Sequence, residues 1–382
     1  MTRRPLLAVA VIAALAVGLT GAGPTSAGGS GSGSGDMDAA LTRARLGTGA
    51  PAASASVAVC GRVVWSGASG VTDLDSRRRV SPATRFVVAS VSKTVTATMI
   101  MQQVRRGRLS LRTRLSRFYP AIPHARDITM SMLLRHRSGL AEYSDDEQIA
   151  ARIDERPRHR WTRNELIRAM RPAQFRPGTR FRYTNSNYVV LGGVLEQVAR
   201  TTVERTFRSG VAAPARMRSS TWTYDPAETS RYAHPHQQDT DGGRRSLLVR
   251  GVLANDTWGP VWTDGGLTST ATDLSRFADA LFRGRLLPPS TVRRMSSVGR
   301  QNYGIGLYAR RAGGHRWLGH DGSYGGYEAE AWTDVDRNLT VAVTVNMEEH
   351  DAADVSASET VWRAVARAAE AARLGRSRCP TT

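Results

Sequence analysis

Residues 90–106 read SVSKTVTATMIMQQVRR, and this stretch decides how the rest of the chain is interpreted. Its apolar residues fall on one face of a helix: Val95, Met99 and Val104. Gly107 follows where a helix commonly ends. The segment therefore predicts a helix that starts directly after Ser90. Ser90 and Lys93 then lie one turn apart at its beginning, where backbone amides are free.

Lys93 is unusual because it is the only lysine of the chain, in which Lys and Arg together number 53. A guanidinium group stays protonated at any ordinary pH, whereas a buried amine can lose its proton and act as a base. A serine three residues before a lysine is common by chance, and a stray surface lysine is the alternative interpretation. Keeping one lysine at this position favours a catalytic pair, Ser90 and Lys93.

The composition indicates a folded protein with a sizeable core. The chain has 382 residues, of which 41% are hydrophobic and 23% are charged, with a net charge of +20. These values exclude wholesale disorder and a polytopic membrane protein. The positive charge favours anionic polymers as partners, and it does not by itself distinguish nucleic acid, a membrane surface or cell-wall material.

The N-terminus has the pattern of a secretion signal. Arg3 and Arg4 precede an uncharged apolar run over residues 5–23, and small residues end at Ala27. We expect residues 1–27 to be a signal peptide cleaved near Ala27, so that the mature protein is secreted. A membrane anchor is the alternative, disfavoured because the strongly apolar part is shorter than about 20 residues. Export disfavours nucleic acid as a partner; the choice between Sec and twin-arginine export stays open.

The rest of the chain divides into three predicted parts. Residues 28–35 form a Gly/Ser linker without core-forming side chains. Residues 36–110 and 261–376 carry strand-like runs and helices that predict an α/β (α+β) domain, whose antiparallel sheet is built from both ends of the chain. Residues 111–260 show short helical patterns broken by Pro and Gly, which predicts an inserted, mainly helical domain.

Individual elements are predicted within this frame. The expected helices cover residues 36–47, 92–106, 129–136, 162–170, 272–282 and 354–374, and the expected strands cover 54–60, 62–66, 303–308, 326–333 and 339–346. The two cysteines, Cys60 and Cys379, lie near opposite ends of the folded part, and whether they pair is left open.

Two further motifs carry chemistry-bearing side chains. Tyr183 and Asn185 stand two residues apart before a helical stretch, although Tyr and Asn at a helix entry are also ordinary packing and capping residues. His320 opens the glycine-rich run His-Asp-Gly-Ser-Tyr-Gly-Gly, which could equally be a simple turn. Glycine at Gly322 would let a ligand approach the backbone closely.

Taken together, Ser-x-x-Lys, Tyr-x-Asn and His-x-Gly follow one another about 90 and then about 137 residues apart. This order resembles the serine beta-lactamase and penicillin-binding protein superfamily. The resemblance covers nearly all of residues 40–375. It is closest to the branch with Streptomyces-type D-alanyl-D-alanine carboxypeptidases, class C beta-lactamases and related esterases.

The resemblance implies a role for each matching residue. Ser90 would be the acylated nucleophile, Lys93 its activator and Tyr183 a proton shuttle, with the choice of base between amine and phenolate left open. The backbone amides of Ser90 and Ser323 would form the oxyanion hole. The remaining expected substrate contacts are Asn185, Trp262, His320, Asp321 and Gly322. No cofactor is implied, and no metal, because the cysteines and histidines lack ligand spacing.

The sequence departs from the carboxypeptidase pattern where it would bind a terminal carboxylate. Asp321 stands where these enzymes usually carry threonine, and it would repel such a carboxylate. Tyr308 stands where an arginine often follows the Gly-x-Gly-Leu strand, and Arg310 or Arg311 is a possible substitute. His136 lies in the segment LLRHRSGL, which we interpret as structural.

We therefore predict a secreted serine hydrolase that works through an acyl-enzyme, first of all a penicillin-binding D-alanyl-D-alanine carboxypeptidase acting on peptidoglycan-type peptides. An esterase, amidase or D-aminopeptidase-like hydrolase is the alternative. A wall-associated penicillin-binding protein without turnover is a further one. The expected partners are a peptide or small ester or amide, beta-lactams as covalent ligands and anionic wall polymers, with no nucleic acid and no stable membrane span.

Overall fold

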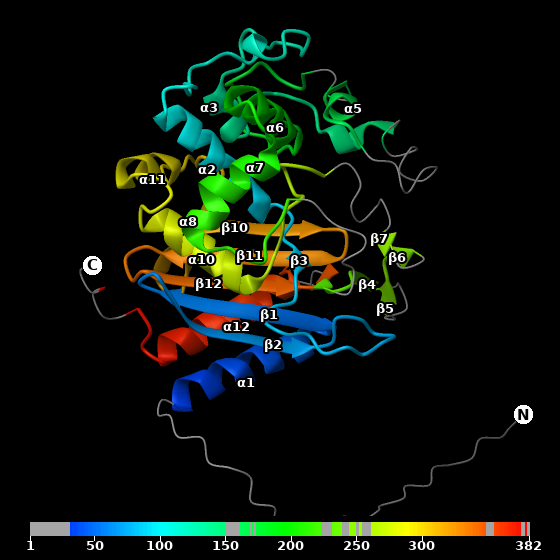
Figure 1. Cartoon of the computed structure of the whole chain (residues 1–382), viewed down its shortest axis with the longest axis vertical. Helices are drawn as coiled ribbons and strands as arrows, with labels where there is room; N and C mark the ends of the chain where they lie inside the picture. Colours follow the sequence, from blue (N-terminus) through cyan, green and yellow to red (C-terminus); the bar gives the residue numbers. More distant parts are fainter. Residues whose placement is uncertain are drawn as a thin grey trace, which may run out of the picture. The chain divides into compact units, whose positions relative to one another are not determined.

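The centre of the fold is a six-stranded antiparallel sheet whose strands come from both ends of the chain (Figure 1). Its order is β2-β1-β12-β11-β10-β9. The strands are β1 (Ala52–Val59), β2 (Arg62–Gly70), β9 (Tyr308–Ala312), β10 (His315–Tyr324), β11 (Tyr327–Asp334) and β12 (Leu339–Val345). β1 lies beside β12, with Ala53 opposite Val345. The predicted fold class, an antiparallel sheet from N- and C-terminal segments flanked by helices, is confirmed.

The computed structural model describes most of the chain, and every structural statement below refers to this part. The described residues are 31–147, 149, 161–168, 170, 173–222, 231–238, 244–249, 252–253, 261–348, 355–375 and 379. Residues Ser32–Thr382 belong to one compact unit. The signal peptide falls outside the described residues, and the predicted domain boundaries stay predictions. No described helix is long and apolar enough to span a bilayer.

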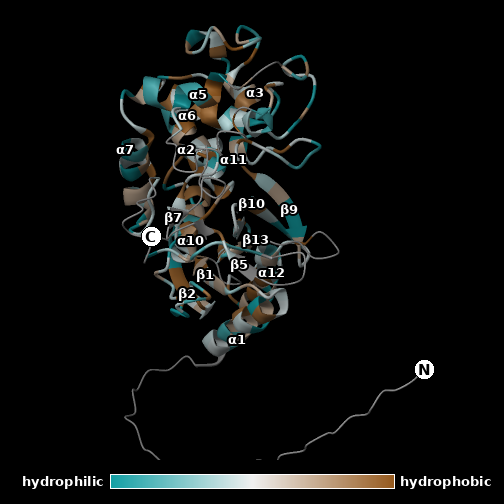
Figure 2. Cartoon of the chain, turned by 90° about the vertical axis from the view of Figure 1, so that its right-hand side faces the viewer, coloured by the Kyte–Doolittle hydropathy of each residue, from teal (hydrophilic) through white to brown (hydrophobic). Residues whose placement is uncertain are grey.

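Helices cover both faces of the sheet. α1 (Gly31–Thr48) and α12 (Ala357–Ala371) bury Leu41, Val361 and Trp362 against one face. α10 (Ala271–Phe282) and α2 (Val91–Arg105) cover the other face, on which they share a large apolar core with the helical region. Figure 2 shows apolar, brown segments in interior elements such as α10 and the central strands. Burial of this kind contributes about 25 cal/mol for each Å² of apolar surface.

The segment between β3 and β8 is mainly helical as far as α8, and its helices α3, α5 and α6 lie at the upper end of Figure 1. Its elements after α2 are η1 (Leu115–Arg117), α3 (Met130–Leu134), η2 (Tyr143–Asp145), α5 (Arg163–Arg168), α6 (Ser186–Ala199), α7 (Val203–Phe207), the π-helix η3 (Arg208–Ala212) and α8 (Ala213–Ala215), and α11 (Pro289–Met295) joins them later in the chain. Small sheets of two or three strands complete the fold: β3 (Phe86–Val87) with β8 (Thr268–Ser269), β6 (Leu248–Val249) with β7 (Val252–Leu253), and β13 (Met347–Glu348) with β4 (His236–Gln238) and β5 (Arg244–Ser246).

Three local predictions were wrong. The strand expected over 303–308 begins only at Tyr308, because residues 303–307 pack across α2 instead. The approach is so close that a Cβ added to Gly306 would lie 2.3 Å from Ala97 Cβ. No strand was predicted over 315–324, yet these residues form β10; the run after His320, for which a simple turn was left open, belongs to this strand because Gly322 and Ser323 pair with β11. α1 starts at Gly31, inside the expected linker, although its first residue in the apolar core is Met37.

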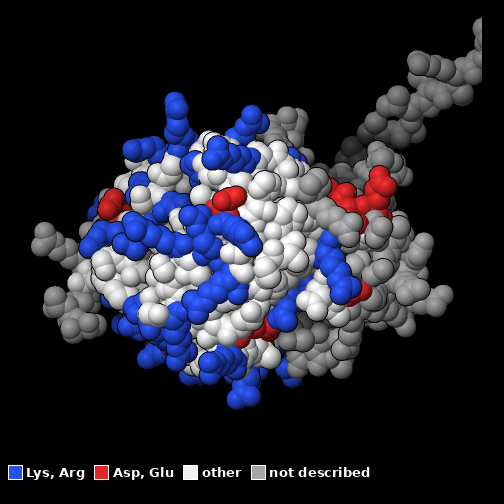
Figure 3. Space-filling view, turned by 90° about the horizontal axis from the view of Figure 1, so that it is seen from above, with Lys and Arg blue, Asp and Glu red and all other residues white. Residues whose placement is uncertain are grey.

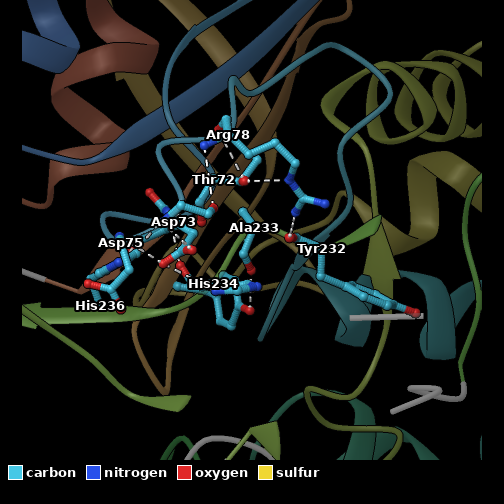
Figure 4. Close-up of polar contacts among 11 residues, drawn as sticks. Thr72, Asp73, Asp75, Arg78, Tyr232, Ala233, His234 and His236 are labelled. Carbon is cyan, nitrogen blue, oxygen red and sulfur yellow. Dashed lines mark hydrogen bonds and ion pairs between the residues drawn. The ribbon is translucent and has the colours of Figure 1, made fainter. Parts of the chain in front are cut away.

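A disulfide and a cluster of polar contacts hold two peripheral parts of the fold in place. Cys60 and Cys379 form a disulfide across 319 residues of sequence. The loop after β2 is fixed by Asp73, whose carboxylate accepts hydrogen bonds from the amides of Asp75 and Ser76 and lies 3.5 Å from His234 Nδ1 (Figure 4). Burial opposes ionisation of Asp73, but the hydrogen bonds with Ser76 and Asp75 and the charge of His234 outweigh it and lower the pKa to about 2.

Candidate active site

Ser90 is presented by a strained turn between β3 and α2. β3 pairs with β8, and Val88 N donates a 3.0 Å hydrogen bond to Leu267 O, so the chain enters the turn in a fixed position. Ala89 then adopts φ +43°, which is unfavourable for a residue with a Cβ and is typical of functional sites. Ser90 caps α2 without using its side chain for the cap. Its hydroxyl is therefore available for chemistry.

Lys93 is fully buried and held against Ser90. Its Nζ donates to Ser90 Oγ at 2.8 Å and to the backbone oxygen of Asp264 at 2.7 Å. Burial lowers its pKa to about 8, although the carboxylates of Asp264, Glu142 and Asp321 oppose this shift. At neutral pH a useful fraction of the amine is thus unprotonated and in contact with the serine hydroxyl.

Tyr183 lies on the other side of the same hydroxyl. Its phenol shares a hydrogen bond with Ser90, and Lys93 Nζ lies 5.0 Å from the centre of its ring. Burial raises its pKa well above 10, and Asp321 and Tyr308 add to this, while the hydrogen bond with Ser90 opposes it. The phenol stays protonated at neutral pH. Of the two bases left open by the sequence, the geometry favours the amine of Lys93.

His136 packs against one face of the Tyr183 ring. Its imidazole stacks on the Tyr183 ring with centroids 4.2 Å apart. Its Nδ1 accepts a 3.1 Å hydrogen bond from Thr184 N, so Nε2 carries the proton and donates to Tyr303 Oη at 3.1 Å. Burial lowers its pKa well below 6.5, and Lys93 and His320 add to this. The LLRHRSGL segment is structural, as expected, and it positions Tyr183.

β10 passes directly behind the nucleophile. A Cβ on Gly322 would lie 2.7 Å from Ser90 N and 2.6 Å from Val88 O, so only glycine fits this approach. β9 pairs with β10 only as far as Gly319, opposite Tyr308, and leaves the edge of the following residues open beside Ser90. Ser323 follows on this open edge, in the place expected for the second oxyanion amide, and its hydroxyl donates to Glu348 Oε1 at 2.6 Å.

His320 and Asp321 alternate across β10. His320 is buried beside Tyr183, with ring centroids 6.2 Å apart, and its Nδ1 donates to Asp321 O at 2.5 Å. Burial lowers its pKa to about 4, against the charge of Asp321, so the imidazole is neutral at pH 7. The Asp321 side chain is 59% exposed, and among the described residues no arginine or lysine lies within ion-pair distance of it.

Asn185 and Trp262 lie around the same centre. α6 begins at Asn185 without a cap hydrogen bond from its side chain, and Asn185 N donates to Glu142 Oε2 at 2.6 Å. Trp262 is half-buried, and its amide donates to Asp264 Oδ1 at 2.8 Å. The structure therefore brings every predicted site residue to one region. Their roles in binding and catalysis stay predictions.

Sequence reasoning assigned no role to two carboxylates of this centre. Asp264 is buried, accepts a 2.9 Å hydrogen bond from Tyr143 Oη and places its backbone oxygen on Lys93. Glu142 has its pKa raised by burial and acts on Lys93 through charge. Neither belongs to a motif with fixed spacing from Lys93. The only sequence signal was their place within residues 40–375, which the resemblance covers, with Glu142 two residues after the segment LLRHRSGL.

A pocket of 420 Å³ continues from Tyr308, Asp321, Gly322 and Ser323 to the start of α12. The Arg310 guanidinium lies in it between the rings of Trp332 and Trp362, at 3.9 and 3.8 Å from their centres. Arg310 also pairs with Glu330 at 3.2 Å and with Glu359 at 3.7 Å. These two contacts occupy the guanidinium group, which speaks against the suggested role of Arg310 as a carboxylate binder.

Comparisons with known proteins agree with this geometry. The model of the Beta-lactamase family matches residues 38–366. A D-aminopeptidase of Brucella suis biovar 1 is 25% identical over 297 residues, which are 75% of this chain and 55% of that protein. The chain thus spans about half the length of the curated relatives it matches.

Two solved structures share the fold. A D-amino acid amidase from Ochrobactrum anthropi SV3, complexed with L-phenylalanine amide, has a TM-score of 0.75 at 23% identity, covering 90% of this chain and 99% of that one. A penicillin-binding protein from Bacillus halodurans has a TM-score of 0.69 at 23% identity, with 87% and 98% covered. At such identities the likeness establishes the arrangement of the chain and leaves its substrate to the site itself.

Proposed function

The chain belongs to the Beta-lactamase family, and from this premise we propose that it hydrolyses amide bonds of small D-amino-acid substrates through an acyl-enzyme on Ser90. The superfamily expected from the sequence is thereby confirmed, and the protein is a serine hydrolase of the beta-lactamase fold. The proposed substrate class is the alternative of the sequence analysis. We prefer this substrate class to that of a carboxypeptidase because the negatively charged Asp321 lies near the nucleophile.

In the proposed reaction Lys93 takes the proton of Ser90 while Oγ attacks the amide carbon. The 2.8 Å contact and the pKa of about 8 support the amine as acceptor. The amides of Ser90 and Ser323 would stabilise the tetrahedral oxyanion, worth about 3 kcal/mol per donor. When the C–N bond breaks, the proton passes from Lys93 through the phenol of Tyr183 to the leaving nitrogen. Water then releases the acyl group from Ser90 with the same residues acting in reverse.

The substrate class rests on one observation: the carboxylate of Asp321 is exposed, its ion-pair neighbour is the neutral His320 at 3.8 Å, and no arginine or lysine of the described residues pairs with it. Tyr183 and His320 mark the end of the site where the leaving nitrogen receives its proton, and Asp321 lies next to His320 at the mouth of the pocket. A carboxylate there repels a leaving group with a terminal carboxylate. It tolerates ammonia or an amine. Asp321 also acts on Lys93 through charge, so the field at the site favours cationic substrates such as amino-acid amides.

A carboxypeptidase would need the opposite charge in this part of the site. It needs a cation for the terminal carboxylate of an acyl-D-Ala-D-Ala peptide, and Arg310 is occupied by Glu330 and Glu359. Covalent binding of beta-lactams and a role on peptidoglycan peptides belong to this second candidate. Secretion after cleavage near Ala27 remains part of the proposal on the sequence pattern alone.

The test compares three substrates with the mature protein and with Ser90→Ala. D-alanine amide, L-alanine amide and a diacyl-Lys-D-Ala-D-Ala peptide are incubated in parallel, and ammonia and free D-alanine are measured. We expect Ser90-dependent ammonia release that prefers the D-isomer, with little D-alanine release from the diacyl peptide. Release of D-alanine from the peptide without amide turnover would transfer the assignment to the carboxypeptidase.

An Asp321→Thr variant sharpens the comparison, because threonine is the residue usual in the carboxypeptidases that the sequence resembles. Removal of the negative charge should raise turnover of the diacyl peptide relative to the amide. Equal ratios in the two proteins would contradict the role given to Asp321. The oxyanion hole and Ser90 are untouched by this change, so total activity on a neutral p-nitrophenyl ester serves as the control for folding.

A further inference from the structure

We propose that a groove between the C-terminal end of α2 and α11 binds the phosphodiester groups of a polyol-phosphate polymer. The groove has a volume of 240 Å³. Its lining consists of Met101, Val104, Arg105, Ser290, Thr291 and Arg294. This site is separate from the catalytic centre, and the proposal does not depend on the substrate class proposed above.

The lining has the chemistry that a phosphodiester on a carbon chain requires. Two guanidinium groups, from Arg105 and Arg294, offer paired N–H donors to phosphate oxygens. Ser290 and Thr291 add hydroxyl donors on the same groove. Val104, which is half-buried, contributes an apolar surface for the carbon atoms between two phosphates, and the buried Met101 lies beneath it. One groove thus offers hydrogen-bond donors for the phosphate and an apolar surface for the carbon chain of one repeat unit of the polymer.

Both arginines are free to act on a ligand. Arg105 and Arg294 are exposed, and no acidic side chain of the described residues lies within ion-pair distance of either. Arg135, directly after α3, donates to Ser297 O at 2.8 Å and to Arg294 O at 3.3 Å, and so fixes the C-terminal end of α11, which is one wall of the groove. The positive charges of Arg105 and Arg294 thus line one groove, and no ion pair among the described residues cancels them.

The surroundings extend the positive field along the molecule. Figure 3 looks onto this end of the protein and shows arginines over much of the described surface, with few acids. In the fully described segment 101–138 the only acidic residue is Asp127. The exposed arginines of this segment are Arg105, Arg106, Arg108, Arg112, Arg114, Arg117, Arg126 and Arg137, and α11 adds Arg293 and Arg294. A chain of regularly spaced phosphates would meet further cations beyond the groove.

The same face lacks the features that read nucleic acid bases. The exposed large hydrophobic residues of the described chain are Leu46 and Val64, both outside this face, so no fully exposed aromatic ring is available for base stacking. Recognition here would rest on phosphate charge and carbon chain alone. That favours a polyol phosphate over a single-stranded nucleic acid.

The groove is far enough from the nucleophile for both to work together. α2 has 15 residues between Ser90 and Arg106. At 1.5 Å per residue the helix separates the two ends by about 22 Å. A polymer bound at the far end of α2 would hold the enzyme on an anionic matrix and leave the cleft at Ser90 open. The groove would thus serve retention at a surface, with no direct part in catalysis.

The experiment measures binding of fluorescently labelled poly(glycerol phosphate) to the mature protein over a range of NaCl concentrations. The test variant is Arg105→Gln/Arg294→Gln, and the matched control is Arg62→Gln/Arg79→Gln, which removes the same charge from exposed positions near the sheet. We expect the test variant to bind at least tenfold more weakly at about 0.1 M salt and its salt slope to fall by about 2. The control should stay close to the unaltered protein.

Two further measurements decide between explanations. Turnover of a p-nitrophenyl ester should be the same in all three proteins, which shows that the variants fold and that the groove is not catalytic. The proposal is overturned if both variants weaken polymer binding equally, since net charge alone would then explain it. It is also overturned if single-stranded DNA or vesicles of anionic lipid bind the groove as tightly as the polymer and lose affinity in the same variant.

Discussion

The pKa of Lys93 gives the most detailed prediction. With a pKa of about 8, about one tenth of the amine is neutral at pH 7 and about nine tenths at pH 9. If neutral Lys93 takes the serine proton, kcat/KM should rise about tenfold between these pH values, with a midpoint near 8. The pH profile of kcat/KM for an amino-acid p-nitroanilide measures this directly, because it reports the free enzyme.

The substitution Asp264→Asn should shift the midpoint of the pH profile of kcat/KM, while the side chain keeps nearly the same shape. The carboxylate of Asp264 raises the pKa of Lys93, so its removal should move the midpoint below 8 and increase the relative rate at pH 6–7. The backbone oxygen that holds Nζ at 2.7 Å is kept, and asparagine can still accept from Trp262 N with its Oδ1 while its Nδ2 donates to Tyr143 Oη. A midpoint that stays put or moves upward would refute the assignment of Lys93 as the base. A thermal melt checks that the variant remains folded.

Three other predictions concern packing and stability. Gly322→Ala should lower activity at least a hundredfold while the protein remains folded, because its Cβ would lie 2.7 Å from Ser90 N; an ester assay beside a circular dichroism spectrum checks this, and near-normal turnover would contradict it. Asp73→Asn should cost about 2 kcal/mol of unfolding free energy at pH 7, since the pKa is lowered from 3.8 to about 2. This contribution is complete above pH 3.8 and is lost as the pH falls through 2, so urea titrations should show a much larger difference between the two proteins at pH 7 than at pH 2. Replacing Cys60 and Cys379 together by serine should lower the unfolding free energy by about 2–4 kcal/mol, and an unchanged urea midpoint would show that the crosslink is dispensable.

Much of the fold followed from local patterns. The helix after Ser90, the capped helix at α10 and the strand β12 were predicted correctly from single segments of sequence. That α2 is buried on all sides over Val91–Gln103, and β12 along its whole length, became visible only in the structure. β10 was missed because its glycines are a turn signal locally. Only the approach of the Ser90 turn to Gly322, which is a tertiary contact, explains why glycine stands in a strand.

The site residues likewise fall into two groups, those that the sequence motifs reveal and those that only the folded structure reveals. Ser90, Lys93 and Tyr183 could be found because their spacing forms a motif. Asp264 could not, since it reaches Lys93 across 171 residues of sequence and acts through a backbone oxygen that any residue possesses. The depressed pKa of Lys93 likewise depends on burial, which only the packed structure provides.

His136 illustrates the limit of motif reasoning in the other direction. A buried histidine was expected to be structural, and its ring contacts agree, yet what it supports is the phenol of Tyr183. Support of a catalytic group by stacking leaves no spacing rule in the sequence. It becomes visible only when the four-ångström contact between the rings is seen.

The most direct test of the account is the site of acylation. Protein quenched in acid during turnover of D-phenylalanine p-nitroanilide is digested and its peptides are weighed. The account predicts a D-phenylalanyl adduct on the peptide that contains Ser90, and no adduct or turnover with Ser90→Ala. Continued turnover by Ser90→Ala, or an adduct on another residue, would contradict it.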